Sequence, residues 1–245
     1  MTKRRHATGH ATRIALMETA ERLFGERGIE GVTMHEIREC CGQANASVIT
    51  YHFGSKTGLI KALIRWRNDD LNARRAELLV AARTSGAERD PRAIVWLVVR
   101  PLLESIEAGS MYVPFLARLS ENPRATKDYW PTDDPEWTTE TLEQLVSTAT
   151  PDMPDRLRRA RAVQLYNSVL NLLGEQARAA HHISELQIHN YVDGWVGMLT
   201  APVSPETAAL LTRQDGSPVE TIDRIGDDGQ RAQGVIEVST SGDAR

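Results

Sequence analysis

The sequence predicts an all-α fold, and three observations carry this prediction. Apolar residues recur at spacings of three and four along most of the chain, and the alternation typical of strands is nearly absent. Helix-start signals precede several of these segments, such as Thr33 followed three residues later by Glu36. Glycines such as Gly28 and Gly42 stand where the apolar stripes end. We therefore expect a succession of helices joined by short turns.

The composition favours a soluble cytoplasmic protein. Hydrophobic residues make up 41% and charged residues 25% of 245 residues, enough for one large domain or two smaller ones. The most apolar run, AIVWLVVRPLL, has eleven residues and contains an arginine and a proline, so it is too short for a membrane span. No apolar segment of the secretory kind follows the basic first residues. The two cysteines, Cys40 and Cys41, are adjacent and poorly placed to bridge each other. We expect a reduced, cytoplasmic chain.

Positive charge is concentrated at the N-terminal end. The net charge is -4, but residues 1–75 contain 13 Lys or Arg and 8 Asp or Glu, a surplus of +5. The remaining 170 residues therefore carry -9. This asymmetry suits a nucleic-acid-binding module on an acidic body. A solvated surface with uneven charge would give the same count.

Three short helical segments open the chain. An apolar stripe predicts an amphipathic helix over residues 12–27, and the capping box at Thr33 begins a second helix that ends at Gly42. After a short turn, Asn45 is the expected N-cap of a third helix, with Val48 and Ile49 facing inward. The first stripe consists of Leu16, Ala20, Leu23 and Phe24. A helix, a short turn and a short helix form a helix-turn-helix, whose second helix lies in the major groove of DNA.

The third helix has a small, polar outer face. If Phe53 points inward with the two residues already named, then Ala46, Ser47, Thr50 and Tyr51 project outward. Small residues near the start of the helix let its backbone approach the base edges closely. Any helical hairpin with a glycine turn would show the same local pattern.

Several motifs at fixed separations resemble the TetR family of bacterial transcriptional repressors. The resemblance covers the run ALMETAERLFGERGIEGVTMHEIRECCG and the later run VITYHFGSKTGLIKAL. The second run holds the pattern HF-x-x-K-x-x-L in His52, Phe53, Lys56 and Leu59. The resemblance implies a homodimer, with two N-terminal helix-turn-helix heads on an all-helical body that senses a ligand and dimerises.

The family pattern also suggests which residues contact DNA. One residue more than usual separates Gly42 from Phe53, which places Thr50 at the position of the family's phosphate-contacting tyrosine. Either Thr50 contacts the phosphate while Tyr51 contacts a base or sugar, or the helix is rotated and Tyr51 takes the usual role. Lys56 follows the cap residue Ser55, so its ammonium and the free amides of the helix start could share one phosphate. The predicted DNA contacts are Thr33, Asn45, Ala46, Ser47, Thr50, Tyr51, His52 and Lys56.

Two further details belong to this head. His52 either approaches a phosphate or closes the small core. Lys3, Arg4 and Arg5 form a basic N-terminal arm without regular structure that could enter the minor groove. We assign residues 1–58, arm included, to the DNA-binding domain.

Residues 59–202 are expected to form a helical regulatory and dimerisation domain. The fourth helix, which contains Leu59, runs from the head into this body, and Asp90 and Pro91 start a nearly all-apolar helix. Pro101 should kink that helix, which either opens space for a ligand or is a packing feature alone. Residues 121–137 are predicted to be an irregular crossing and a candidate lid. The predicted pocket residues are Trp66, Trp96, Tyr112, Phe115 and Trp130, although aromatic residues at helical spacing also suit a core.

Two helices near the end of this domain resemble an interface. Gly174, Gly194 and Gly197 would permit close helix approach. Two such helices from each subunit could form a four-helix dimer interface, or they could pack within one chain. The predicted interface residues are Tyr166, Leu170, Leu173, Ala177, Val192, Trp195 and Leu199.

No metal, cofactor or enzyme motif stands out. His181, His182 and His189 lack the spacing and companion ligands of a metal site. We find no phosphate-binding glycine loop, nucleophile elbow or zinc helix. Residues 203–245 are expected to be a mostly disordered acidic tail.

The sequence therefore predicts a homodimeric, ligand-responsive repressor, released from a pseudo-palindromic DNA operator by a small-molecule effector. The alternatives are a helical enzyme, a small-molecule-binding protein without specific DNA recognition, and a DNA-compacting protein.

Overall fold

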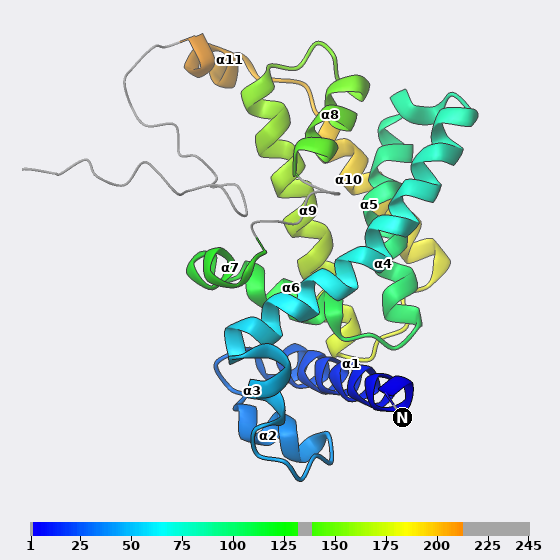
Figure 1. Ribbon diagram of the computed structural model, residues 1–245. Helices are drawn as coiled ribbons and strands as arrows, with labels where there is room; N and C mark the ends of the chain where they lie inside the picture. The colour runs from blue at the N-terminus through cyan, green and yellow to red at the C-terminus, as the bar shows by residue number, and fades with distance from the viewer. Residues whose placement is uncertain (1, 132–138, 213–245) are drawn as a thin grey trace, which may run out of the picture.

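The computed structural model describes residues 2–131 and 139–212, and within these ranges every regular element is helical (Figure 1). The all-α prediction is confirmed. The elements are α1 (Thr2–Arg27), α2 (Met34–Cys40), α3 (Val48–Phe53), α4 (Lys56–Thr84), the 3₁₀ turn η1 (Ala87–Arg89), α5 (Pro91–Glu107), α6 (Tyr112–Ser120), α7 (Pro123–Tyr129), α8 (Thr139–Ala149), α9 (Asp155–Arg178), α10 (Glu185–Thr200) and α11 (Pro205–Thr212). None of the helices that the structure describes could cross a membrane.

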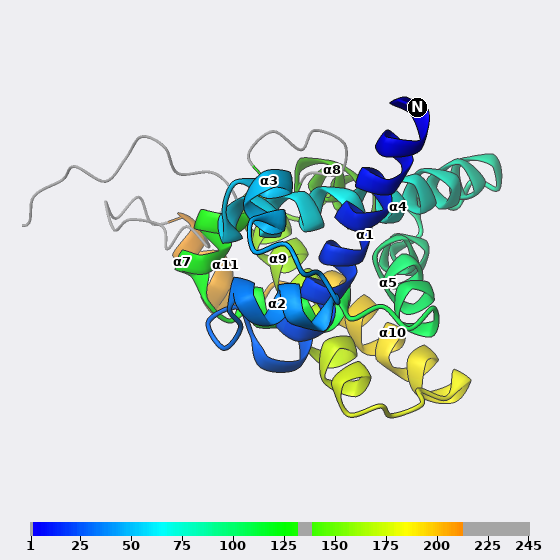
Figure 2. The ribbon, with the colours of Figure 1, turned by 60° about the horizontal axis from the view of Figure 1, so that its bottom comes forward.

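Helices α1, α2 and α3 form a small head at one end of the molecule (Figures 1 and 2). Its core is made by the stripe that the sequence predicts on α1, together with Ile37 of α2, Val48 and Ile49 of α3 and Leu59 of α4, all buried. These apolar contacts hold α2 and α3, which with seven and six residues are too short to be stable alone. The prediction of three packed helical segments is confirmed.

Helix α1 begins ten residues earlier than predicted. It runs from Thr2, so the backbone of residues 3–5 is helical and the prediction of an irregular arm is wrong. Extending an existing helix requires no new nucleation, and Lys, Arg and Ala are good helix formers, so the basic segment can continue the helix toward the N-terminus.

Helix α4 is the covalent link between head and body, as predicted. It spans 29 residues and buries Leu59, Ile60, Leu63 and Ile64 along one face. Its N-terminal turns pack on α1 and α3, and later turns pack on α5. A displacement of the body can therefore reach the head through one continuous helix.

Helix α6 packs between α1 of the head and α9 of the body. A Cβ atom at Gly25 of α1 would lie 2.9 Å from the carbonyl oxygen of Met111, just before α6. A Cβ atom at Gly174 of α9 would lie 2.7 Å from the Cβ atom of Ala117. Since real side chains do not approach this closely, both glycines are needed for the backbones to pack. Gly174 thus serves packing within one chain.

Two predictions of irregular structure need correction. In the segment predicted to be an irregular crossing, residues 123–129 form α7, which Asn122 caps by accepting from the amide of Ala125. The end of that segment, residues 132–137, lies outside the described residues. In the predicted tail, residues 205–212 form α11, because a proline at the first position and Ser204 before it favour a helix start. The prediction for residues 213–245 also lies outside the described residues.

Candidate nucleic-acid interface and body cavity

Helix α2 begins with the predicted capping box. The hydroxyl of Thr33 accepts from the amide of Glu36, and the amide of Thr33 donates to the Glu36 carboxylate at 2.7 Å. Arg27 of α1 also donates to this carboxylate, at 3.0 Å. These contacts, the Thr33 amide first, lower the pKa of Glu36 to about 2. Thr33 therefore sets the start of α2, and its hydroxyl is engaged with Glu36.

The turn between α2 and α3 is shaped by two side chains. Asn45 Oδ1 accepts from the amide of Ser47 at 3.0 Å, which is an Asx turn. Helix α3 begins only at Val48, with Ser47 at the N-cap, so the prediction that Asn45 caps it is wrong. Arg38 of α2 donates to the carbonyl oxygens of Gln43 and Ala44, at 3.0 and 3.3 Å. The sequence analysis did not predict these bonds of Arg38, because their acceptors are backbone atoms, which every residue has.

The outer face of α3 matches the predicted orientation. Ala46, Ser47 and Thr50 are exposed, and Tyr51 is 82% exposed. Val48 and Ile49 are buried, and Phe53 packs partly buried against the core. The helix thus presents small and polar groups followed by one large aromatic side chain. Thr50 and Tyr51 are both accessible, so their division of roles on DNA stays a prediction.

His52 lies at the edge of the head core. Its ring meets the Tyr51 ring edge-on, with centroids 5.0 Å apart, and is half-buried. Burial, and then the charge of Arg13, lower the pKa of His52 below its ordinary 6.5. Arg13 in turn lies over the Phe53 ring, 4.8 Å from its centroid. His52 is therefore neutral near pH 7.

Lys56 has a structural partner in addition to any DNA contact. Ser55 caps α4 as predicted, accepting from the amide of Gly58 at 3.0 Å. Lys56 lies in the first turn, and its ammonium donates to the carbonyl oxygen of Ile29 at 2.6 Å, above the Phe24 ring. An ammonium has three protons to donate, so two remain for a phosphate.

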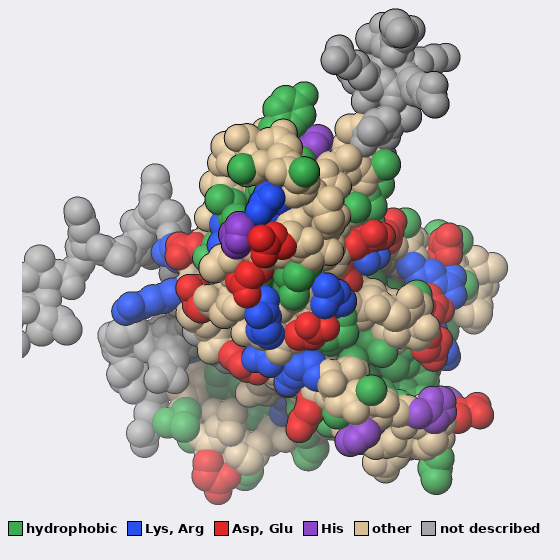
Figure 3. Space-filling model, turned by 90° about the horizontal axis from the view of Figure 1, so that it is seen from below, with side chains coloured by type: hydrophobic (Ala, Val, Ile, Leu, Met, Phe, Trp, Pro, Cys, Tyr) green, Lys and Arg blue, Asp and Glu red, His purple; other side chains and the backbone are tan. Residues whose placement is uncertain are grey.

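Figure 3, which shows the molecule from below, displays basic and acidic side chains intermixed on this side.

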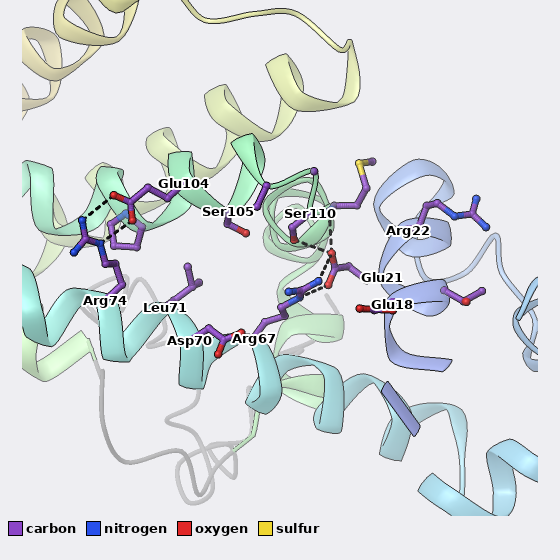
Figure 4. Close-up of a pocket in the computed structure, with 15 residues that line it drawn as sticks. Glu18, Glu21, Arg22, Arg67, Asp70, Leu71, Arg74, Glu104, Ser105 and Ser110 are labelled. Carbon is purple, nitrogen blue, oxygen red and sulfur yellow. Dashed lines mark hydrogen bonds and ion pairs between the residues drawn. The ribbon is translucent and has the colours of Figure 1, made fainter. Parts of the chain in front are cut away.

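The body holds a cavity of about 720 Å³ where α1, α4, α5 and the turn before α6 meet (Figure 4). Pro101, at which we predicted a kink, lies within α5 and lines this cavity. Charged residues dominate the other walls. They include Glu18, Glu21 and Arg22 on α1, Arg67, Asp70 and Arg74 on α4, and Glu104 on α5.

Glu21 joins three segments at one wall of the cavity. Its carboxylate, 3% exposed as a residue, accepts from Arg67 Nε at 2.5 Å and Nη2 at 3.2 Å. It also accepts from the hydroxyl of Ser110 at 2.7 Å and from the amide of Met111 at 2.9 Å. Figure 4 shows these bonds converging on the carboxylate. The head helix α1 is thereby tied to α4 and to the turn before α6.

A second ion pair closes the opposite end of the cavity. Arg74 donates to both oxygens of Glu104, at 2.8 and 3.0 Å, and to Glu77 at 2.8 Å. The hydrogen bond from Arg74 lowers the pKa of Glu104, and nearby Arg100 contributes in the same direction. Both pairs join residues at least 30 positions apart, so sequence reasoning missed them.

The five predicted aromatic residues do not line this cavity. Tyr112 and Phe115 are fully buried core residues, and the Tyr112 hydroxyl donates to Asn68 at 2.9 Å. Trp66 lies under the Arg67 guanidinium, and Trp96 contacts Arg100 and His189. Trp130 packs partly buried against the core. Their burial fits the core packing that helical spacing also allows, and their assignment to an effector pocket stays a prediction.

The predicted interface residues are mostly buried within one chain. Leu170, Leu173, Val192, Trp195 and Leu199 are each at most 3% exposed, and Trp195 donates to Ser168 of α9 at 2.9 Å. Tyr166 and Ala177 are half-buried. Within one chain, this stripe packs α9 and α10 against each other and against α5. The assignment of the seven residues to a dimer contact stays a prediction.

The histidines do not gather into a metal site within the described part of the chain. His181 and His182 are exposed, whereas His189 lies 3.1 Å from an Arg92 nitrogen.

A head with an outward-facing α3, carried on a helical body, defines the class of helix-turn-helix DNA-binding regulators. The family model described as bacterial regulatory proteins, tetR family, matches residues 16–63, the segment that forms this head. Residues 16–63 are thus similar to the part of TetR-family transcriptional regulators that this family model describes.

Two curated relatives match part of the chain. The HTH-type transcriptional repressor AcnR of Corynebacterium glutamicum is 33% identical over 93 residues, covering 36% of this chain and 47% of the relative. The HTH-type transcriptional repressor KstR2 of Rhodococcus jostii is 28% identical over 118 residues, covering 46% and 54%. The chain thus spans about half the length of the curated relatives it matches.

One solved structure shares the fold over most of the chain. It is a gamma-butyrolactone receptor described as an ArpA-like protein, 18% identical, with a TM-score of 0.50. The likeness covers 79% of this chain and 97% of that receptor. At this identity the likeness shows the fold alone.

Proposed function

We propose that this protein is a sequence-specific transcriptional repressor that binds a pseudo-palindromic operator as a homodimer and is released by a small-molecule effector. The observation that carries the proposal is the outward face of α3 on a rigidly packed head. Ser47, Thr50 and Tyr51 are exposed there, while the opposite face of the same helix is buried. A helix held in this way can enter the major groove without unfolding any other contact.

Two kinds of contact follow from the geometry of the head. Ala46 and Ser47 are small, so the start of α3 approaches the base edges closely, and Tyr51 reaches a base, sugar or phosphate beyond them. The unused protons of Lys56 and the first amides of α4 bind a backbone phosphate. Phosphate contacts fix the register of the head, and the contacts of α3 supply the sequence preference.

The outer face of α10 supports the dimer. The exposed positions Leu186, Asn190, Gly194 and Gly197 recur at helical spacing, and Leu186 is 81% exposed. Nothing lies within 4 Å of a Cβ atom built on either glycine. An exposed apolar side chain beside backbone free of side chains suits close packing against the same helix of a second copy. We therefore place the dimer contact on this face rather than on the buried stripe.

Effector release requires a coupling between body and head. The dimer holds two α3 helices about one DNA turn apart, roughly 34 Å. An effector that binds better to a conformer with another head spacing lowers the affinity for DNA. A coupling of about 1–3 kcal/mol corresponds to a ~5–150-fold loss.

Selection of binding sites from a pool of random duplexes, at near-physiological salt, tests this proposal. A two-fold symmetric motif supports both specific recognition and the dimer. Uniform binding to all duplexes would favour a DNA-compacting role, and absence of binding would favour a helical protein that recognises only small molecules. Tyr51→Ala should alter the enriched motif, whereas Val80→Ala, an exposed change on α4 outside the head, should leave it unchanged.

A further inference from the structure

The last turn of α1 is bound by one side chain of the body. Arg118 is the one charged residue in α6, whose sequence is YVPFLARLS. Its Nε donates to the carbonyl oxygen of Gly25 at 3.0 Å, and its Nη2 donates to that of Glu26 at 2.9 Å. Carbonyl groups in the last turn of a helix carry partial negative charge, so a guanidinium is a suitable partner. The body therefore fixes the position at which α1 ends.

The loop after α1 begins at this contact. Gly28 leaves the helix with φ +77°, and a Cβ atom built on it would lie 3.9 Å from the Arg118 Cδ atom. The next residue, Ile29, is 8% exposed, and its carbonyl oxygen accepts from the Lys56 ammonium at 2.6 Å. Arg118 and Lys56 thus hold the same short segment, residues 25–29, from two different helices. The first belongs to the body, and the second is the proposed phosphate contact.

Helix α6 also connects the end of α1 to α9. Ala117, the neighbour of Arg118, faces α9, where a Cβ atom at Gly174 would lie 2.7 Å from the Ala117 Cβ atom. On the other side, a Cβ atom at Gly25 of α1 would lie 2.9 Å from the carbonyl oxygen of Met111, just before α6. Packing this close does not let α6 move far without shifting a neighbouring backbone. A displacement of α9 therefore reaches the end of α1 through α6 (Figure 1).

We propose that Arg118 positions the Lys56 ammonium for a DNA phosphate by holding the end of α1, a role that rests on the function proposed above. The bond to Ile29 takes one ammonium proton and leaves the other two for the phosphate. Without Arg118, the Ile29 carbonyl shifts and the Lys56 nitrogen shifts with it. Hydrogen bonds weaken steeply as distance and angle depart from their optimum, so a small shift lowers the affinity for DNA. An effector that displaces α6 weakens DNA binding by the same route.

A double-mutant cycle on DNA affinity tests this role. Arg118→Gln, Lys56→Gln and the double variant, all as full-length chains, are titrated into the selected duplex and followed by fluorescence anisotropy. Arg118→Gln should weaken binding about 3- to 10-fold when Lys56 is present and less than about twofold when it is already glutamine, since residues of one hydrogen-bond network are coupled. The salt dependence of Arg118→Gln should be flatter than that of the native chain and approach that of Lys56→Gln.

Two further variants separate positioning from charge. Arg118→Lys keeps a cation that can donate to the carbonyl oxygens of α1, so it should recover most of the affinity. Arg124→Gln removes a charge of the same sign from an exposed position on α7, which packs on α6, and its effect should be small and the same with or without Lys56. Arg118→Met, which keeps the stem of the side chain, takes the place of Arg118→Gln if circular dichroism shows that the latter does not fold.

The same cycle on stability needs no DNA. Urea unfolding measures the loss caused by Lys56→Ala in the native chain and in Arg118→Gln, and the loss should be smaller in Arg118→Gln, because the Ile29 carbonyl is then no longer held at Lys56. Additive losses of DNA affinity, whatever the stabilities do, would overturn the positioning role and leave the repressor standing. A chain that binds no DNA would sink the repressor and the phosphate contact instead, and equal losses of stability in both backgrounds would then overturn the link between Arg118 and Lys56 as well.

Discussion

The ammonium nitrogen of Lys56, at the start of α4, lies 2.6 Å from the carbonyl oxygen of Ile29, in the loop that follows α1. Lys56, which the family pattern assigns to a DNA phosphate, thus also connects α4 to the loop after α1 within the head. Its charge stands over the Phe24 ring and next to the first amides of α4. The proposed phosphate contact and the stability of the head therefore depend on one side chain, and different substitutions should separate the two effects.

Lys56→Gln should keep the hydrogen bond to Ile29 and remove the charge. We expect nearly unchanged stability, weaker binding to all duplexes, and a salt dependence flatter by about one unit of slope, because one phosphate contact is lost. Lys56→Ala should do the same to DNA binding and also destabilise the head by about 1–2 kcal/mol, through the unpaired carbonyl. Fluorescence anisotropy at several salt concentrations and urea unfolding measure the two effects. An unchanged salt slope in both variants would contradict the phosphate assignment.

Ser47→Ala and Tyr51→Ala should change sequence preference rather than non-specific affinity. Both side chains are exposed on the outer face of α3 and neither carries a charge. Loss of one base contact typically costs about 1–3 kcal/mol at the contacted position. Repeating the site selection with each variant shows the positions at which preference relaxes. Loss of affinity that is the same for every duplex would mean that these residues contact only the backbone.

Glu21→Gln should loosen the junction of head and body. It leaves the guanidinium of Arg67 without its anion and weakens the bonds from Ser110 and Met111. We expect destabilisation of about 2–3 kcal/mol by urea unfolding, since a largely buried pair loses one member. The exposed pair of Arg22 and Glu26, 3.5 Å apart, provides the comparison: Glu26→Gln should cost about 0.5 kcal/mol or less. Equal effects of the two substitutions would contradict the role of Glu21.

The capping box should add a pH-dependent part to the stability of the head. The pKa of Glu36 is about 2 in the fold and about 4.5 as a free side chain, so its contribution is complete above pH 4.5. As the pH falls toward 2, the carboxylate becomes protonated in the fold and the contribution is lost. The stability difference between the native chain and Glu36→Gln should therefore shrink between pH 5 and pH 2. A stability difference that stays constant from pH 5 to pH 2 would contradict this role of the Glu36 carboxylate.

Gly194→Arg should convert the dimer that we propose to a monomer without unfolding the chain. The residue is exposed on α10 and has open space around it in one chain, so the long side chain clashes only with a second copy. Analytical ultracentrifugation measures the state of assembly, and circular dichroism checks the helix content. Ala81→Arg, at an exposed helical position outside α9 and α10, should remain dimeric. If Gly194→Arg sediments like the native chain, the dimer contact lies elsewhere.

Local features could be predicted from the sequence, and contacts between distant segments could not. The capping box of Thr33 and Glu36 and the outward face of α3 depend on residues within one or two turns. The bond from Arg67 to Glu21 spans 46 positions, and nothing in the spacing of either helix indicates the other partner.

The packing of the predicted interface stripe within one chain was missed for a similar reason. The apolar stripe that contains Val192 and Trp195 was recognised, but periodicity does not say which surface covers it. In the folded chain α9 and α5 cover that stripe, and the small residues on the opposite side of α10 stay exposed. Predicting this would have required the packing order of the helices.

The proposal of a dimeric, sequence-specific repressor is tested most directly by the ratio of its affinities for two DNA duplexes. The symmetric duplex obtained by selection and a scrambled duplex of the same composition are each titrated with the protein at physiological salt. We predict a preference of at least about 10³-fold for the symmetric duplex, with two protomers bound. An affinity ratio near one would contradict a dimeric, sequence-specific repressor. Binding of one protomer to a single half-site, with the affinity measured for the symmetric duplex, would contradict it as well.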